Sequence, residues 1–385
     1  MGKVRLGIIG VGNMGSSHIR NYLQNKMPEF IVTAVCDIKD ERLAWAKEQL
    51  PDVKTFTDAS ELMDSGEVDA ILIATPHYFH PPMVIEGLNK GLHVMSEKPA
   101  GVYTKQVREM NEVAKKSNKV FGIMFNQRTN CLYRKAHEIV HSGKFGEMKR
   151  VTWIITDWYR TQAYYNSGGW RATWSGEGGG VLLNQCPHQL DLWQWICGMP
   201  EKITAVCHEG KWHDIEVEDD VMIYAQYKNG ATGTFITTTG DYPGTNRLEI
   251  TLDKAKIICE NSVLTVTELS QNVSENLKGC GDGFTDIDYK TYEAELDGRN
   301  EQHVEVMNKF AAAILRGEEL TASGIEGING LTISNAAFLS SWLGKTVELP
   351  FDEDLFYNML QAKIKNSTYV KIVEEKINED MSSTY

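Results

Sequence analysis

The stretch VRLGIIGVGNMG, residues 4–15, decides the fold of this chain of 385 residues. An apolar run over residues 4–9 is typical of a buried strand, and a helical pattern follows the glycines. A G-x-G-x-x-G between a strand and a helix predicts a turn that binds the pyrophosphate of a dinucleotide. The residues expected at this anion are Gly10, Gly12, Asn13, Met14 and Gly15.

Asp37 ends the second expected strand, 22 residues after Gly15. An acid near this spacing binds the ribose hydroxyls of a dinucleotide and repels a 2′-phosphate. No arginine directly follows it, because Ile38, Lys39 and Asp40 come next. The sequence therefore predicts NAD rather than NADP. The alternative is a structural glycine turn with an acid that caps the next helix.

The order of elements predicts an α/β fold that begins with a doubly wound parallel sheet, because short apolar runs alternate with helical patterns in the first third. The expected strands are residues 4–9, 31–36, 70–74, 93–96 and 120–124, with helices that include 41–49, 82–89 and 105–117. Later segments alternate as antiparallel strands do. These are residues 148–156, 204–206, 221–227, 232–238, 248–252 and 255–260, followed by helices at 302–316 and 324–344, the second broken at its glycines, and a polar helical tail. We predict domains at residues 1–125 and 126–385.

Composition narrows the class of protein. The chain has 39 basic and 52 acidic residues, which gives a net charge of −13. Hydrophobic residues make up 42% of the chain, an ordinary globular fraction that excludes a disordered or fibrous protein. The acidity disfavours nucleic acid and anionic membranes as partners. The seven cysteines form no Cys-x-x-Cys pair, so no metal site is expected and a reducing compartment is favoured. Without a membrane-length apolar run or a signal peptide, the expected location is the cytoplasm.

Three further motifs follow the glycine turn in order: TPHYFH at residues 75–80, EKPA at 97–100 and GGGVLLNQCPHQLD at 178–191. Together the four resemble those of the Gfo/Idh/MocA oxidoreductases, the family of glucose–fructose oxidoreductase and inositol dehydrogenase. The resemblance covers about residues 3–350. It implies a Rossmann domain followed by an α/β domain with a large open, predominantly antiparallel sheet. It also implies hydride exchange between nicotinamide and a sugar, polyol or glycoside, and a homo-oligomer such as a dimer or tetramer.

The resemblance also implies site residues. Lys98 matches the lysine of the family's E-K-P segment, and His188 matches its histidine. Asn184 stands where the family usually has an aspartate, and Asp191 matches a second acid three residues after the histidine. The N-Q-C-P-H form is similar to a branch that oxidises glycosides, often at C3.

The chemistry of alcohol oxidation gives these residues roles. His188 is the expected general base, because its ordinary pKa lies nearest neutrality. Lys98 is expected to hydrogen-bond the reacting oxygen. Asp191, one helical turn on, would orient His188 or bind a substrate hydroxyl, and Asn184 would bind another. The alternatives are an N-cap for Asn184 and a plain loop lysine for Lys98.

Residues at the carboxyl ends of the strands are expected near the cofactor, because parallel sheets bind ligands at that edge. They are Thr75, Pro76, His80, Glu97 and Lys98.

Seven aromatic residues fall within residues 153–174, where the average composition would place about two. Aromatic rings stack on the apolar faces of sugars, while polar neighbours bind the hydroxyls. We therefore expect a substrate loop that includes Arg160, Tyr164, Tyr165 and Trp170, and a core position for Trp153. A neutral polyhydroxy substrate fits the acidic chain.

Three functions remain open from the sequence. The first is an NAD-dependent dehydrogenase of sugars, glycosides or polyols. The second is a glycosidase that uses NAD transiently for oxidation, elimination and re-reduction. The third is a nucleotide-sensing homologue without catalysis, which Asn184 leaves open although Lys98 and His188 argue against it.

Overall fold

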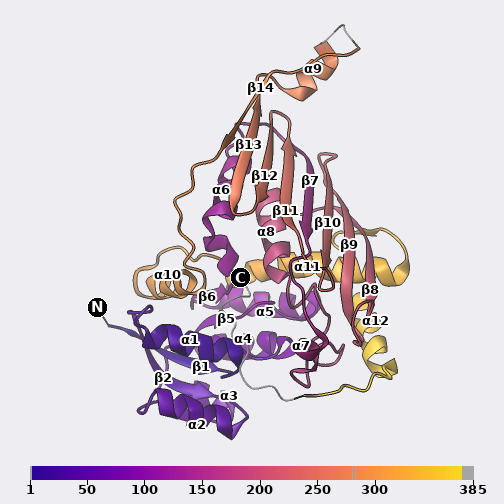
Figure 1. The fold of residues 1–385 in the computed structure, drawn as a ribbon. Coiled ribbons are helices and arrows are strands. Elements are labelled where there is room, and N and C mark those ends of the chain that lie inside the picture. The colour runs from indigo at the N-terminus through magenta and orange to yellow at the C-terminus, as the bar shows by residue number, and fades with distance from the viewer. Residues whose placement is uncertain (1, 280, 282, 375–385) are drawn as a thin grey trace.

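The computed structural model describes residues 2–279, 281 and 283–374, and they form two large sheets (Figure 1). The first sheet has six parallel strands in the order β3-β2-β1-β4-β5-β6. This order confirms the predicted Rossmann sheet. The strands are β1 (Val4–Ile9), β2 (Phe30–Cys36), β3 (Lys54–Phe56), β4 (Ala70–Ile73), β5 (His93–Ser96) and β6 (Phe121–Ile123).

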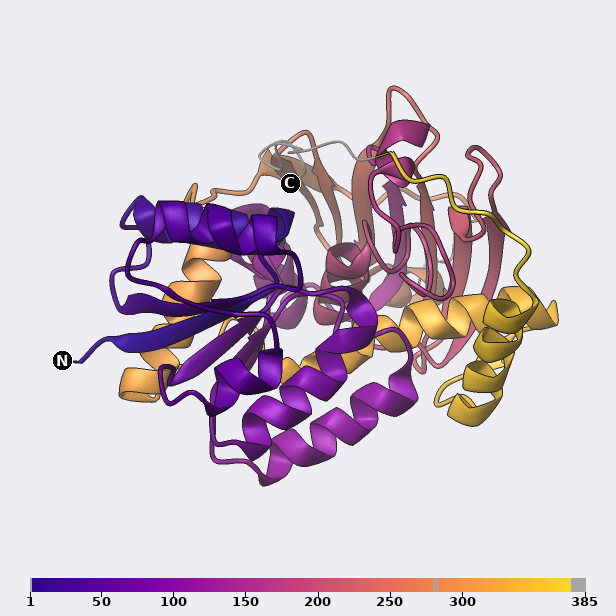
Figure 2. The same cartoon turned by 90° about the horizontal axis from the view of Figure 1, so that it is seen from below.

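Helices cover both faces of this sheet, as Figure 2 shows from below. Helices α1 (Asn13–Leu23) and α2 (Asp40–Gln49) share one buried cluster with the side chains of β1. On the other face pack α3 (Ala59–Asp64), α4 (His80–Asn89) and α5 (Thr104–Lys116). A short 3₁₀ turn, η1 (His77–Phe79), leads into α4.

The second sheet has nine strands in the order β14-β13-β12-β11-β7-β10-β9-β8-β15. Among the described strands of this second sheet, only the pair β7 and β10 is parallel; its other pairings are antiparallel, as predicted. The strands are β7 (Met148–Ile155), β8 (Lys202–Glu209), β9 (Glu218–Gln226), β10 (Thr232–Thr238), β11 (Asn246–Leu252), β12 (Ala255–Glu260), β13 (Val263–Leu269), β14 (Tyr289–Glu293) and β15 (Val347–Glu348).

One face of the second sheet is covered by helices, and its core is aromatic. Trp193 stacks on Phe235 with ring centroids 5.4 Å apart, and Trp153 is buried beside them, as expected. The other face leaves Val206 and Met222 exposed. The remaining elements are η2 (Asn126–Thr129), α6 (Cys131–His141), α7 (Gln162–Asn166), α8 (Pro187–Cys197), α9 (Val273–Gly279), α10 (His303–Arg316), η3 (Gly324–Glu326), α11 (Gly327–Leu343) and α12 (Glu353–Asn366).

The predicted strands and internal helices are confirmed with small shifts at their ends, but four strands were missed. Of the predicted helical tail, α12 covers residues 353–366, residues 367–374 are not helical, and residues 375–385 lie outside the described residues. Strand β3 has three residues at a sheet edge, too short for a periodic signal. Strands β13, β14 and β15 lie at or next to the edges of the second sheet. The helix expected over residues 324–344 begins with the 3₁₀ turn η3 and continues as α11. No helix in the described residues is long and apolar enough to cross a membrane.

Helix α10 lies far along the chain but packs on the first sheet. Phe310 is fully buried in the cluster of β1 and β2, and its ring lies 6.3 Å from that of Phe30. The division of the chain at residue 125 therefore stays a prediction, with α10 crossing back over it.

Replacing Phe310 with alanine should lower the free energy of unfolding by about 3–5 kcal/mol, because a buried aromatic side chain leaves a cavity. Denaturant unfolding followed by circular dichroism measures this. The matched control is Phe284→Ala, since Phe284 is exposed and its loss should cost less than about 0.5 kcal/mol. Equal effects of the two changes would contradict the packing of α10.

Candidate active site

The residues predicted to bind the cofactor lie at one edge of the parallel sheet. The glycine turn follows β1, Asp37 follows β2, Thr75 follows β4 and Glu97 follows β5. Because these strands are parallel neighbours, their carboxyl ends meet at this edge. The structure thus brings together segments that are far apart in the sequence.

The glycine turn has the form that a bound pyrophosphate requires. Gly10 has φ +92°, and a Cβ there would lie 2.5 Å from the carbonyl oxygen of Ala74. A Cβ at Gly15 would collide with the carbonyl oxygen of Gly10, so α1 packs closely against the turn. At Gly12 the corresponding space is open. Asn13 and Met14 begin α1, whose N-terminal amides attract an anion. The described residues therefore fit NAD.

The Asp37 carboxylate lies beside this turn. Its Oδ2 accepts a hydrogen bond of 2.7 Å from the amide of Val11, and Oδ1 accepts one of 2.9 Å from the amide of Lys39. The side chain is half-buried. This is the position that binding of an adenosine ribose requires.

His80 joins two of the strand ends. Its ring nitrogens lie 2.7 Å from the carbonyl oxygens of Thr75 and Pro99. Burial lowers the pKa of this histidine. The ring connects the Thr75-Pro76 loop to the segment that carries Lys98.

A buried cluster behind the site was missed from the sequence. Glu97 Oε1 lies 2.9 Å from Nε2 of His18 on α1, and the His18 ring contacts that of His303 at 5.6 Å. Burial opposes ionisation of Glu97, but the hydrogen bond and charge of His18 outweigh it and lower the pKa. Burial lowers the pKa of His303 to about 4. His18, Glu97 and His303 are far apart in the sequence and belong to no common motif, so the sequence alone does not predict that they meet.

Lys98 and the segment before α8 meet directly. Lys98 Nζ donates a hydrogen bond of 3.0 Å to the backbone oxygen of Asn184, which lies in that segment. Burial lowers the pKa of Lys98, and the nearby positive charges of Arg171 and Arg160 act in the same direction. The carboxylates of Glu97 and Glu177 oppose this change. Lys98 is half-buried, and these contacts favour a residue of the site over a plain loop lysine.

His188 is the second residue of α8 and is buried, with the Phe125 ring edge-on at 6.4 Å. Burial lowers the pKa of His188 well below its ordinary value of 6.5, and the charges of Lys98 and His303 add to this. The imidazole is therefore neutral at neutral pH, the form that can accept a proton.

The Asn184 side chain belongs to a hydrogen-bond network. Its Nδ2 donates to Glu177 Oε1, and its Oδ1 accepts from the Tyr164 hydroxyl at 3.2 Å. That hydroxyl accepts hydrogen bonds from Arg171 at 2.7 Å and Gln185 at 3.1 Å. The N-cap of α8 is Cys186, so the N-cap interpretation of Asn184 is wrong.

Asp191 and Tyr165 have other partners than those expected. Both Asp191 oxygens accept hydrogen bonds from the buried Arg128, at 2.7 and 2.8 Å. An ion pair that occupies both oxygens favours a structural role over orientation of His188 or contact with a hydroxyl. Tyr165 is buried and its hydroxyl lies 2.7 Å from Thr239 Oγ1, which places it in the core.

The rest of the aromatic loop reaches the site. Trp170 is half-buried and lies edge-on to His77, which follows β4, with centroids 5.3 Å apart. The guanidinium carbons of Arg160 and Arg171 lie 5.1 and 4.5 Å from the centre of the Tyr164 ring. Tyr164, Trp170 and Arg160 therefore remain candidates for substrate contact.

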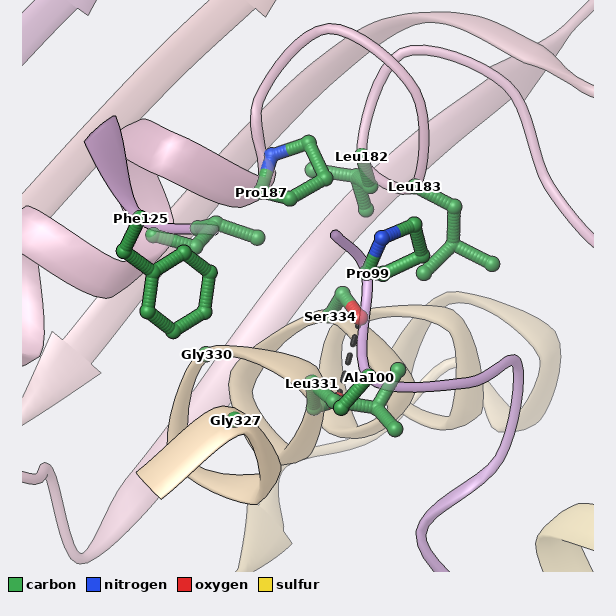
Figure 3. Close-up of a pocket in the computed structure, with 11 residues that line it drawn as sticks. Pro99, Ala100, Phe125, Leu182, Leu183, Pro187, Gly327, Gly330, Leu331 and Ser334 are labelled. Atoms are coloured by element: carbon green, nitrogen blue, oxygen red, sulfur yellow. Dashed lines mark hydrogen bonds between the residues drawn. The ribbon is translucent and has the colours of Figure 1, made fainter. Parts of the chain in front are cut away.

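A small apolar cavity lies behind these groups. Figure 3 shows Pro99 near Leu183 and Pro187, with Ala100 beside Leu331 of α11. No titratable side chain lines the cavity. It marks the packing between the Lys98 and His188 segments rather than a place for a polar substrate.

Two family models match the chain. The oxidoreductase family with an NAD-binding Rossmann fold matches residues 4–125, and the GFO/IDH/MocA C-terminal domain matches residues 133–258. The chain belongs to the GFO/IDH/MocA oxidoreductase family. Its cofactor is therefore NAD, and it is an NAD-dependent oxidoreductase that acts on CH–OH groups.

Similar proteins agree with this membership. The myo-inositol 2-dehydrogenase of Thermotoga maritima is 25% identical over 90% of this chain and 98% of its own length. The WlbA dehydrogenase of Bordetella pertussis, solved with NADH and UDP-GlcNAcA, has a TM-score of 0.75 at 25% identity and covers 91% of this chain and 100% of its own. Levoglucosan dehydrogenase, solved with NADH and L-sorbose, shares the fold with a TM-score of 0.76 at 20% identity over 91% of this chain and 99% of its own.

Replacing Asp37 with serine should lower kcat/KM with NAD by about tenfold, since hydrogen bonds to the ribose are lost, and should raise it with NADP. Initial rates with both cofactors measure the change. Asp40→Ser is the control, because Asp40 is exposed and lies three residues after Asp37, at the start of α2. A wild-type preference for NADP would contradict the role of Asp37.

Replacing Lys98 with methionine should raise the pKa of His188 towards its ordinary value, because the positive charge that disfavours the imidazolium is removed. The pH below which His188 is protonated, and so cannot accept a proton from the substrate, would then be higher. NMR titration of histidine-labelled protein, assigned with His188→Gln, measures the pKa. Lys105→Met, at an exposed lysine paired with Asp354, is the control. An unchanged His188 titration in the Lys98 variant would show that the charge has no such effect.

Proposed function

We propose that this protein oxidises a secondary hydroxyl of a neutral sugar, glycoside or cyclitol, and that its substrate is a glycoside oxidised at C3. The observation that supports this most is the hydrogen bond from Lys98 Nζ to Asn184, four residues before His188. It brings a cation and a neutral imidazole to the edge where the cofactor binds.

NAD, when bound, supplies the hydride acceptor. His188 takes the proton of the hydroxyl, because its lowered pKa keeps the imidazole neutral. Lys98 donates a hydrogen bond to the same oxygen and stabilises the negative charge that develops on it.

The side chains around the site favour a carbohydrate as the substrate. The half-buried rings of Tyr164 and Trp170 offer flat apolar surface, and Arg160 and the Asn184 amide offer polar contacts for hydroxyls. Relatives are named for inositol and levoglucosan, which are neutral polyhydroxy compounds. The Asn184 network supports the glycoside assignment, since Asn184 belongs to the segment similar to that branch.

The working form is a cytoplasmic homo-oligomer, a dimer or tetramer. The exposed Val206, Met222 and Tyr224 on the uncovered face of the second sheet support association through that face.

The test is incubation of the purified protein with NAD and a panel of inositols, hexoses and aryl glucosides, with NADH absorbance and products followed together. Oxidised product should accumulate with an equal amount of NADH. His188→Asn should lower kcat by about 100-fold or more with NAD binding retained. Sugar released without net NADH would replace this function with a glycosidase. If the protein binds NAD but oxidises none of the compounds in the panel, a nucleotide sensor is favoured.

A further inference from the structure

Glu177 is a buried acid beside the catalytic lysine that the roles given above leave without a function. Its side chain is 1% exposed, and it lies in the turn between the aromatic loop and the 178–191 segment. Oε2 accepts a hydrogen bond of 2.6 Å from the amide of Ala172, and Oε1 accepts one from Asn184 Nδ2. Both oxygens therefore face N–H donors, which is the arrangement that stabilises a carboxylate.

The hydrogen bond to Glu177 also determines how Asn184 is oriented. Because a carboxylate accepts only, the Asn184 amide must turn its Nδ2 towards Glu177 and its Oδ1 towards the Tyr164 hydroxyl. The backbone oxygen of the same residue accepts the hydrogen bond of Lys98. Glu177, Asn184 and Lys98 thus form a continuous chain of contacts.

The charges around Glu177 are mostly positive. Burial raises the pKa of Glu177, and the charge of Arg171 opposes this most strongly. Lys371 of the C-terminal segment adds a further positive charge. The other groups that face it are Lys98, Glu218, Tyr165 and, at its backbone oxygen, His77 at 3.2 Å.

We propose that Glu177 is the positioning residue of the site: it holds Asn184 in place for Lys98 and supplies the negative charge that Asn184 lacks. Removing this charge would destabilise the protonated form of Lys98. Glu177 acts in the dehydrogenation proposed above, on which its role rests, and it acts through Asn184.

The experiment compares Glu177→Gln, Asn184→Asp and the double variant E177Q/N184D, with the substrate that the wild type oxidises. In Glu177→Gln we expect kcat to fall by about tenfold to 100-fold through misplacement of Lys98. The alkaline limb of the pH profile of kcat, where Lys98 loses its proton, should move to lower pH. The Kd of NADH, measured by fluorescence, should stay unchanged.

The double variant moves the carboxylate from residue 177 to residue 184, with the amide now on the glutamine. It should recover most of the lost kcat and return the alkaline limb towards that of the wild type. Asn184→Asp alone places two carboxylates together, and the added negative charge favours the protonated form of Lys98. The alkaline limb of the pH profile of this variant should therefore move to higher pH. The matched control is Glu216→Gln, since Glu216, just before β9, accepts a hydrogen bond of 2.8 Å from the amide of Trp174 in the aromatic loop, whereas Glu177 accepts its hydrogen bond from Asn184.

Glu177 would be structural only if the double variant had as low a kcat as Glu177→Gln. The same would follow if the alkaline limb of the pH profile stayed in place in Glu177→Gln. The same shift of the alkaline limb in Glu216→Gln would also overturn the inference, because any acid that holds the loop would then have this effect. Melting temperatures of all variants separate these results from loss of folding. If the wild type itself oxidises no carbohydrate, the proposed function fails instead.

Discussion

The hydrogen bond between Lys98 Nζ and the Asn184 backbone is the contact on which the site depends. Lys98 follows a strand of the parallel sheet, whereas Asn184 lies in the glycine-led segment that packs on the second sheet. That segment is held in turn by Glu218 of β9, whose carboxylate accepts the amides of Gly180 and Leu182 at 2.8 and 2.9 Å. Burial raises the pKa of Glu218 to about 8, although these amides oppose the change. The geometry of the proposed site therefore depends on both sheets.

Burial is what gives the two central side chains their chemistry. It disfavours the charged form of Lys98 and of His188, and the positive charge of Lys98 lowers the pKa of His188 further. A neutral imidazole and a lysine that remains a strong hydrogen-bond donor can share one oxygen atom without repulsion. Buried carboxylates keep this balance, since Glu97 and Glu177 both favour the charged lysine.

The sequence predicts what is local and leaves out what is distant. The glycine turn, Asp37 and the strand that ends before Lys98 were predictable because each is a pattern within a few residues of the chain. Asp191 was correctly placed one turn after His188, but its partner Arg128 comes from another element 63 residues away. Glu177 and His18 carried no signal at all, because an acid in a glycine-rich turn and a histidine in a helix are typical of many surfaces. Only the fold shows that both are buried.

The aromatic loop shows why composition alone could not locate a substrate. Tyr164 and Tyr165 are adjacent, yet their rings are nearly perpendicular, with one at the site and the other in the core beside Thr239. The loop is held from behind as well, since Lys371 donates to the carbonyl oxygen of Tyr165 and the amide of Glu374 donates to that of Asn166. The surface that Tyr164 presents thus depends on core packing and on the C-terminal segment. The Tyr164 hydroxyl is itself held by Asn184, Arg171 and Gln185, so in the proposed function the ring would lose little conformational entropy on binding a substrate.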